Sequence, residues 1–95
     1  MKVKARYFAR VREIVGKNEE VLEVSENTSV QAFLTILSQK YGASFREYVF
    51  AKNGEELSLD LNFLLDGKNI NTINGLKTTL CEGSAFAIIP PVGGG

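Results

Sequence analysis

The chain contains no histidine and only one cysteine, Cys81. The absence of histidine removes the commonest general base and the commonest metal ligand. One cysteine excludes an internal disulfide and a cluster of thiolate ligands, and no second thiol or nearby base activates it. We predict a structural or incidental thiol, with a persulfide carrier as the alternative. These absences argue against a self-sufficient hydrolase or metalloenzyme, and we expect no bound metal or cofactor.

The chain also has no net charge and no long apolar run. Eleven Lys and Arg residues balance eleven Asp and Glu residues, so no overall field attracts nucleic acid or an anionic membrane. No apolar stretch approaches the roughly 20 residues of a membrane span, and the start "MKVKARYF" lacks the apolar core of a signal peptide. We therefore expect a cytoplasmic protein with no nucleic-acid partner and no membrane partner.

The 95 residues suffice for one small domain, and their periodicity predicts its first elements. Residues 2–9 and 20–24 alternate between apolar and polar side chains, as half-buried strands do. Residues 30–41 carry one apolar stripe at helical spacing. Thr28 and Gln31 have the spacing of a capping box at the start of this helix.

The second half of the chain predicts two further strands. Residues 43–51 are expected to hold one short helix, and residues 59–65 alternate as a strand that ends at the turn Asp66-Gly67. Residues 70–80 are polar and punctuated by glycine, which indicates a loop. The last strand, 84–89, is apolar on both faces, which is typical of a central strand.

The order of these elements predicts an α+β fold of the ubiquitin-like β-grasp type, in which one main helix packs across a mixed sheet. In that fold the first and last strands lie side by side at the centre of the sheet. We expect one β-grasp domain over residues 1–89 and a flexible tail, Pro-Pro-Val-Gly-Gly-Gly, over residues 90–95.

Two apolar residues stand on the outer faces of the first and last strands. Phe8 shares its strand face with three cationic residues, and Ile89 lies opposite the main core residues of its strand. If these strands are neighbours, Phe8 and Ile89 form one exposed apolar patch, which is typical of a partner-binding surface. Packing under a neighbouring loop is the alternative for Phe8.

Two carboxylate pairs, Glu19-Glu20 and Glu55-Glu56, are candidates for acid–base chemistry. Both pairs lie in polar, turn-like stretches, and no nearby feature indicates a raised pKa. We interpret both pairs as solvated side chains.

The last six residues combine two prolines with three glycines. Pro90 and Pro91 donate no backbone hydrogen bonds, so they end strand pairing and keep the chain extended. Gly93, Gly94 and Gly95 have no side chains, so this segment fits a tunnel too narrow for a Cβ atom. A carboxylate at Gly95 needs activation, and the chain lacks a nucleotide-binding loop, so another protein must activate it. A frayed or engineered chain end is the alternative.

Four segments together resemble the MoaD/ThiS family of ubiquitin-like sulfur carriers, and within it the small subunit of molybdopterin synthase. They are YFARVRE at 7–13, LLDG at 64–67, GLKTTLCEG at 75–83 and AIIPPVGGG at 87–95. They span essentially the whole chain in the order of the family. Thiamin-type carriers lack the Pro-Pro-Val segment, which favours the molybdopterin branch.

The resemblance implies a carrier without catalytic activity of its own. An E1-like enzyme would use ATP to adenylate Gly95, and a sulfur donor would convert it into a thiocarboxylate, with Gly93 and Gly94 as the threading segment. The large subunit of molybdopterin synthase would accept the tail and pass the sulfur into the molybdenum or tungsten cofactor. A ubiquitin-like modifier, joined through Gly95 to lysines of target proteins, is one alternative, because the same activation precedes it. A β-grasp interaction module whose tail does no chemistry is the other.

The resemblance also implies which residues bind these partners. Phe8 and Ile89, which the strand pattern already brings together, belong to this set. Its other members are Arg12, Ile70, Pro90, Pro91 and Val92.

Overall fold

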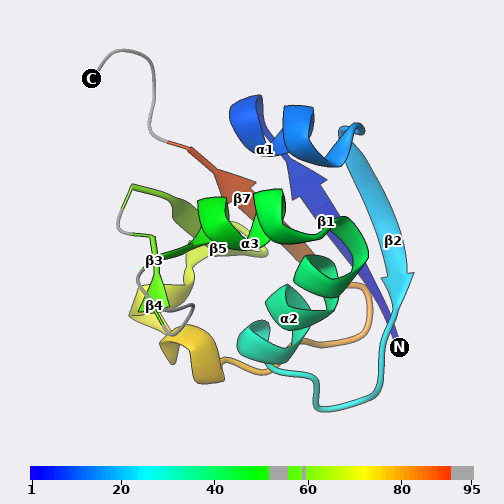
Figure 1. Cartoon of the computed structure of the whole chain (residues 1–95). Helices are drawn as coiled ribbons and strands as arrows, with labels where there is room; N and C mark the ends of the chain where they lie inside the picture. Colours follow the sequence, from blue (N-terminus) through cyan, green and yellow to red (C-terminus); the bar gives the residue numbers. More distant parts are fainter. Residues whose placement is uncertain (52–55, 59, 91–95) are drawn as a thin grey trace.

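The computed structural model describes residues 1–51, 56–58 and 60–90, and it places five strands in one sheet (Figure 1). The order across this sheet is β2-β1-β7-β5-β6. These strands are β1 (Lys2–Tyr7), β2 (Glu19–Glu23), β5 (Asn62–Leu65), β6 (Lys68–Asn69) and β7 (Ala85–Ile89). A smaller sheet pairs β3 (Phe50–Ala51) with β4 (Glu56–Leu57).

The helices are α1 (Ala9–Val15), α2 (Val30–Tyr41) and α3 (Ala43–Val49), with two short 3₁₀ helices, η1 (Ile70–Thr72) and η2 (Gly75–Lys77). In Figure 1, α2 and α3 lie across one face of the main sheet. None of the helices in the described part of the chain has the length and apolar character needed to cross a bilayer.

The first and last strands are direct neighbours, as the β-grasp prediction requires. β1 runs antiparallel to β2 and parallel to β7, with Tyr7 opposite Ile88 at the end of the parallel pair. β7 pairs on its other side with β5, so it has a strand on each side. The predicted central position of the last strand is therefore confirmed, with Phe86 and Ile88 buried on its inner face and Ala85, Ala87 and Ile89 partly exposed on its outer face.

The core lies between the main sheet and α2. Alternate residues of the two central strands point toward the helices and are buried, among them Val3 and Ala5 of β1 and Phe86 of β7. The Phe86 ring meets the ring of Phe33 from α2 edge to face, with 5.7 Å between their centroids. A fully buried Val or Phe side chain of this kind stabilises the fold by about 1.5–3 kcal/mol.

Two local predictions at the ends of elements are wrong. β1 ends at Tyr7 rather than Ala9, because Ala9 takes a left-handed backbone conformation (φ 51°) that turns the chain into α1. The cap of α2 is Ser29, whose Oγ accepts a hydrogen bond from the Ala32 amide at 3.1 Å. The Thr28 hydroxyl instead donates to the Ser25 carbonyl at 2.6 Å, so no capping box forms.

The segment 70–80, predicted as a loop, contains η1 and η2. The Asn69 side chain accepts a hydrogen bond from the Asn71 amide and caps η1, while Ile70 and Leu80 enter the core. The predicted short helix over 43–51 is confirmed as α3, whereas Leu59, the expected start of the third strand, lies outside the described residues. Asp66 and Gly67 both have positive φ values, as the predicted tight turn requires.

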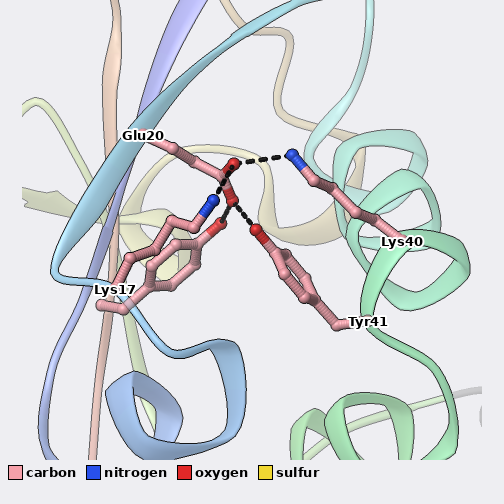
Figure 2. A network of polar contacts seen from close by, with 5 residues as sticks. Lys17, Glu20, Lys40 and Tyr41 are labelled. Atoms are coloured by element: carbon pink, nitrogen blue, oxygen red, sulfur yellow. Dashed lines mark hydrogen bonds and ion pairs between the residues drawn. The ribbon is translucent and has the colours of Figure 1, made fainter.

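A polar network centred on Glu20 ties the edge of the sheet to α2 (Figure 2). The side chain is only 10% exposed, so the interpretation of Glu20 as solvated is wrong. Its carboxylate accepts hydrogen bonds from the hydroxyls of Tyr7 and Tyr41, the former at 2.6 Å. The amines of Lys40 and Lys17 lie 2.7 and 3.5 Å from Oε1. One carboxylate thus joins β1, β2, α2 and the loop before β2.

This network changes the titration of its members. Burial by itself would raise the pKa of the Glu20 carboxyl, but the hydrogen bonds from Lys40, Tyr41 and Tyr7 lower this pKa to about 2. Burial and the hydrogen bond to Glu20 raise the pKa values of Tyr7 and Tyr41, so both hydroxyls stay protonated and keep donating. The carboxylate therefore stays ionised at pH values well above 2.

We predict that Glu20 makes the stability of the fold depend on acid pH. The folded pKa of about 2 lies below the ordinary value of 4.5, so its contribution is complete above about pH 4.5 and is lost as the pH falls toward 2. Urea unfolding should show that Glu20→Gln lowers the free energy of unfolding at pH 7 by on the order of 3 kcal/mol. This difference should fall to roughly 1 kcal/mol at pH 2.5, where the folded carboxylate is still partly ionised, and nearly vanish below pH 2.

Glu26→Gln is the matched control, because Glu26 is exposed in the loop before α2. It should leave the unfolding free energy unchanged at both pH values. An equal loss in Glu20→Gln at pH 7 and pH 2.5 would contradict the assigned role of the carboxylate charge.

Candidate functional site

The face of the main sheet that α2 and α3 leave open is apolar at its centre and charged toward β2. Along β7 this face presents Ala85, Ala87 and Ile89, all of them partly exposed. Strand register places Leu64 of β5 beside Ala87 on one side, and Arg6 of β1 beside it on the other. An apolar strip with a cationic border is therefore built into the two central strands.

Phe8 extends this strip at the end of β1. Its backbone is still extended (φ −130°, ψ 148°), so its side chain lies on the same face as that of Arg6. The Arg6 guanidinium carbon stands 5.3 Å from the centre of the Phe8 ring, within the range of a cation–π contact. The register of β1 and β7, continued one step beyond Tyr7 and Ile88, sets Phe8 beside Ile89.

Local backbone geometry fixes the position of Phe8 at the corner where β1 turns into α1. Phe8 caps the N-terminus of α1, and its carbonyl accepts from the amides of Val11 and Arg12. The next residue, Ala9, has a φ of 51°, a left-handed conformation that residues other than glycine seldom adopt. The chain therefore turns sharply at Phe8 and leaves its ring half-buried at the corner rather than within the core.

Arg12 and Phe8 line one shallow cleft beside this strip. The cleft has a volume of about 310 Å³, and the Arg12 guanidinium reaches Asn18 Oδ1 at 3.5 Å across it. Arg6 borders the same cleft and lies 3.8 Å from Glu19. Its complete lining is Arg6, Tyr7, Phe8, Arg12, Asn18 and Glu19. The structure thus brings together Phe8, Arg12 and Ile89 at one end of the sheet.

This arrangement suits recognition of another protein. A half-buried aromatic ring beside arginine side chains has the residue types that contribute most of the binding energy at protein interfaces. The Arg12 side chain is exposed, and among the described residues it forms no ion pair with a carboxylate. A partner with an apolar anchor and an acidic side chain would match both parts of the surface.

Other members of the predicted partner surface lie elsewhere. Ile70 is 1% exposed and belongs to the core, so its assignment to the surface is wrong. The polar residues around Ile70 gave no sign of the 3₁₀ helix η1, which turns the Ile70 side chain inward. Pro90 is also buried and offers little area to a partner. Pro91, Val92 and the glycines Gly93, Gly94 and Gly95 lie outside the described residues.

Two residues of this region were missed in the sequence. Arg6 was not predicted to belong to the partner surface. It lies two residues before Phe8 and therefore on the same strand face, and this spacing was the available signal. Glu20 was read as part of a polar turn, whereas β2 already begins at Glu19. Glu20 shares its parity with Leu22, and this spacing by two residues would have placed its side chain on the inner face.

Comparisons with known proteins agree with this geometry. A model of the ThiS family matches residues 5–95. Small archaeal modifier protein 3 of Haloferax volcanii is 30% identical over 95 residues, which cover 100% of both proteins. Two solved structures confirm the ubiquitin-like β-grasp fold.

The first is the crystal structure of SAMP1 from Haloferax volcanii, with a TM-score of 0.85 and 25% identity over 100% of both chains. The second, from Pyrococcus furiosus, is named as molybdopterin converting factor subunit 1. It has a TM-score of 0.77 and 28% identity, over 97% of this chain and 99% of that chain. The fold and the family resemblance predicted from the sequence are both confirmed.

We predict that the aromatic ring of Phe8 contributes little to stability. Phe8→Ala should lower the free energy of unfolding by about 1 kcal/mol or less, because the ring is only half-buried at the corner. Phe86→Ala is the matched comparison, since that ring is 0% exposed and should cost about 3–5 kcal/mol. Urea denaturation of both variants measures the difference. Equal losses would show that Phe8 belongs to the core.

Proposed function

This chain belongs to the ThiS family, and on that premise we propose that it is the sulfur-carrier small subunit of a molybdopterin synthase. The observation that carries the proposal is the surface of Phe8, Arg12 and Ile89 at the end of β7. The strand leads from this surface directly into Pro90 and the sequence Pro-Val-Gly-Gly-Gly. A partner that binds the surface would therefore receive the C-terminal residues in its own active site.

The chemistry of the carrier takes place at Gly95. An E1-like enzyme joins the Gly95 carboxylate to the AMP group of ATP and releases pyrophosphate. A donor that carries its sulfur as a persulfide then attacks the acyl carbon, and AMP leaves with its bonding electrons. A thiol of the donor cleaves the acyl disulfide so formed, which leaves the thiocarboxylate on Gly95 and a disulfide on the donor. The chain supplies the carboxylate and the docking surface, while the activating enzyme supplies ATP and the catalytic groups. The carrier itself is not an enzyme and holds no cofactor.

The residues before Gly95 suit transfer to a second partner. Pro90 and Pro91 favour an extended backbone, and Gly93 and Gly94 carry no side chain to obstruct a narrow channel. The large subunit of the synthase would bind the same exposed strip and accept the thiocarboxylate. The sulfur would then enter the pterin dithiolene of the molybdenum or tungsten cofactor. The name of the Pyrococcus furiosus structure supports this branch.

A second candidate function is a ubiquitin-like protein modifier. Its support is the Haloferax volcanii relative, which is named a small archaeal modifier protein and aligns over the full length of both chains. In this reaction a target lysine amine attacks the activated Gly95, AMP leaves, and an isopeptide bond forms. Both functions use the same activated glycine and differ in the group that attacks it, a sulfur donor or a lysine amine.

We predict that the cognate E1-like enzyme, ATP and a sulfur donor convert Gly95 into a thiocarboxylate. Intact-mass spectrometry should show the mass gain of one oxygen-to-sulfur exchange, and fragmentation should place the gain at Gly95. A variant that ends at Gly94 and a reaction without ATP serve as controls, and neither should gain mass.

An unchanged mass, with an enzyme that activates another carrier, would contradict activation and leave only a binding module. A second measurement, on the thiocarboxylate form, distinguishes the synthase role from the modifier role. Transfer of its sulfur to the pterin in the presence of the large subunit supports the synthase role. Isopeptide remnants of Gly95 on lysines in cell lysate, without such transfer, support the modifier role.

A further inference from the structure

The edge strand β2 presents unpaired backbone groups along its outer side. Hydrogen bonds join Tyr7 to Asn18 and Met1 to Val24, which fixes the alternation along the antiparallel pair of β1 and β2. Every second residue of β2 therefore bonds to β1, and the residues between them point their N–H and C=O groups outward. These outward residues are Glu19, Val21 and Glu23. No strand of the described part of the chain pairs with this side of β2.

The side chains of the same three residues lie together on the open face of the sheet. Val21 is 59% exposed, and Ile73 is the only other large exposed apolar residue among those described. Carboxylates flank Val21 on both sides, and the side chains of Glu19 and Glu23 are 50% and 70% exposed. The edge thus presents the order acidic, apolar, acidic at spacings of two residues.

Cations of the chain already contact these carboxylates from the β1 side. Lys4 and Arg6 lie 3.5 and 3.8 Å from Glu19, and the amino group of Met1 lies 3.3 Å from Glu23. These contacts come from the inner side of the edge. Each carboxylate has two oxygens with about four acceptor positions, so an additional basic group can bind from the outer side.

The opposite side of the edge, toward α2, has different chemistry. Figure 2 shows the amines of Lys17 and Lys40 beside Glu20 on this side. Both lysine side chains are 45% exposed while they pair with the one carboxylate. Side chains of an added strand that point toward α2 would meet these two amines. Basic residues are disfavoured at those positions, and small polar or acidic residues are favoured.

The Glu20 network also holds the edge in place. Tyr7, Tyr41 and Lys40 all contact the Glu20 carboxylate, so β2 is tied to both β1 and α2. An edge strand that is already ordered loses little conformational entropy when another strand pairs with it. This property distinguishes β2 from a frayed edge.

We infer that the outer edge of β2 is a second docking site, which pairs with an extended segment of another protein. That segment carries basic, apolar and basic side chains at alternate positions and non-basic side chains between them. Main-chain hydrogen bonds to Glu19, Val21 and Glu23 provide the pairing, and the alternating side chains provide the selectivity. The inference does not rest on the sulfur chemistry, because β1 separates this edge from β7.

A second copy of the chain fits this edge poorly. In an antiparallel pair of two β2 strands centred on Val21, Glu19 of each copy would face Glu23 of the other. Like charges directly opposite one another destabilise a strand pair. The same carboxylates that select a basic segment therefore disfavour self-association of the edge.

The test is an NMR titration of the isotope-labelled full chain with two short peptides. One peptide is Thr-Lys-Thr-Val-Thr-Lys-Thr, and the other replaces both lysines with glutamate. The lysine peptide should shift the amide signals of Glu19, Val21 and Glu23 and slow their hydrogen exchange, while the signals of Phe8 and Ile89 stay unchanged. The glutamate peptide should bind about tenfold more weakly, from two lost charge pairs.

The double variant Glu19→Gln with Glu23→Gln should bind the lysine peptide about tenfold more weakly and lose the preference between the two peptides. Glu26→Gln is the matched control and should bind like the unchanged protein. A lysine peptide with an N-methylated valine keeps its charges but lacks the central amide donor, and it should bind more weakly than its parent. Equal binding of both peptides, shifts confined to Phe8 and Ile89, or β2 protection that arises from dimerisation without peptide would each overturn the inference.

Discussion

The parallel pairing of β1 with β7 is the constraint on which the rest of the structure depends. It joins the two ends of the described chain at the centre of the sheet, with β2 on one side and β5 on the other. Inward, it aligns Tyr7 and Ile88 for the core under α2. Outward, it aligns Phe8 with Ile89, so an apolar surface forms where β7 ends. Core and surface therefore follow from one register.

The Glu20 network holds β1 in place from its β2 side, opposite to β7. The Tyr7 hydroxyl, at the last residue of β1, donates to a carboxylate that also binds Tyr41 and Lys40 of α2. The position of Phe8, the next residue, is therefore fixed by contacts on both sides of the strand end. Removing a partner of a largely buried charge is destabilising, so the four donors around Glu20 together hold the end of β1 against β2 and α2.

Much of the fold could be predicted from the sequence, because alternation and helical spacing report directly on burial. The expected neighbourhood of Phe8 and Ile89 followed from placing the first and last strands side by side, which the pairing of β1 with β7 confirms. Ile70 could not be placed, since its neighbours are polar and only tertiary packing turns η1 inward. Glu20 was misread for the converse reason: a carboxylate is seldom buried, and its four partners come from distant parts of the chain.

The most direct test of this account is a double-mutant cycle of Phe8→Ala and Ile89→Ala, with affinity for the cognate E1-like enzyme measured by calorimetry without ATP. If the two residues form one docking surface, each change should weaken binding by about tenfold. The double variant should then lose less than the product of the two effects, because the residues share a contact area. Unchanged affinity in both single variants would contradict the account.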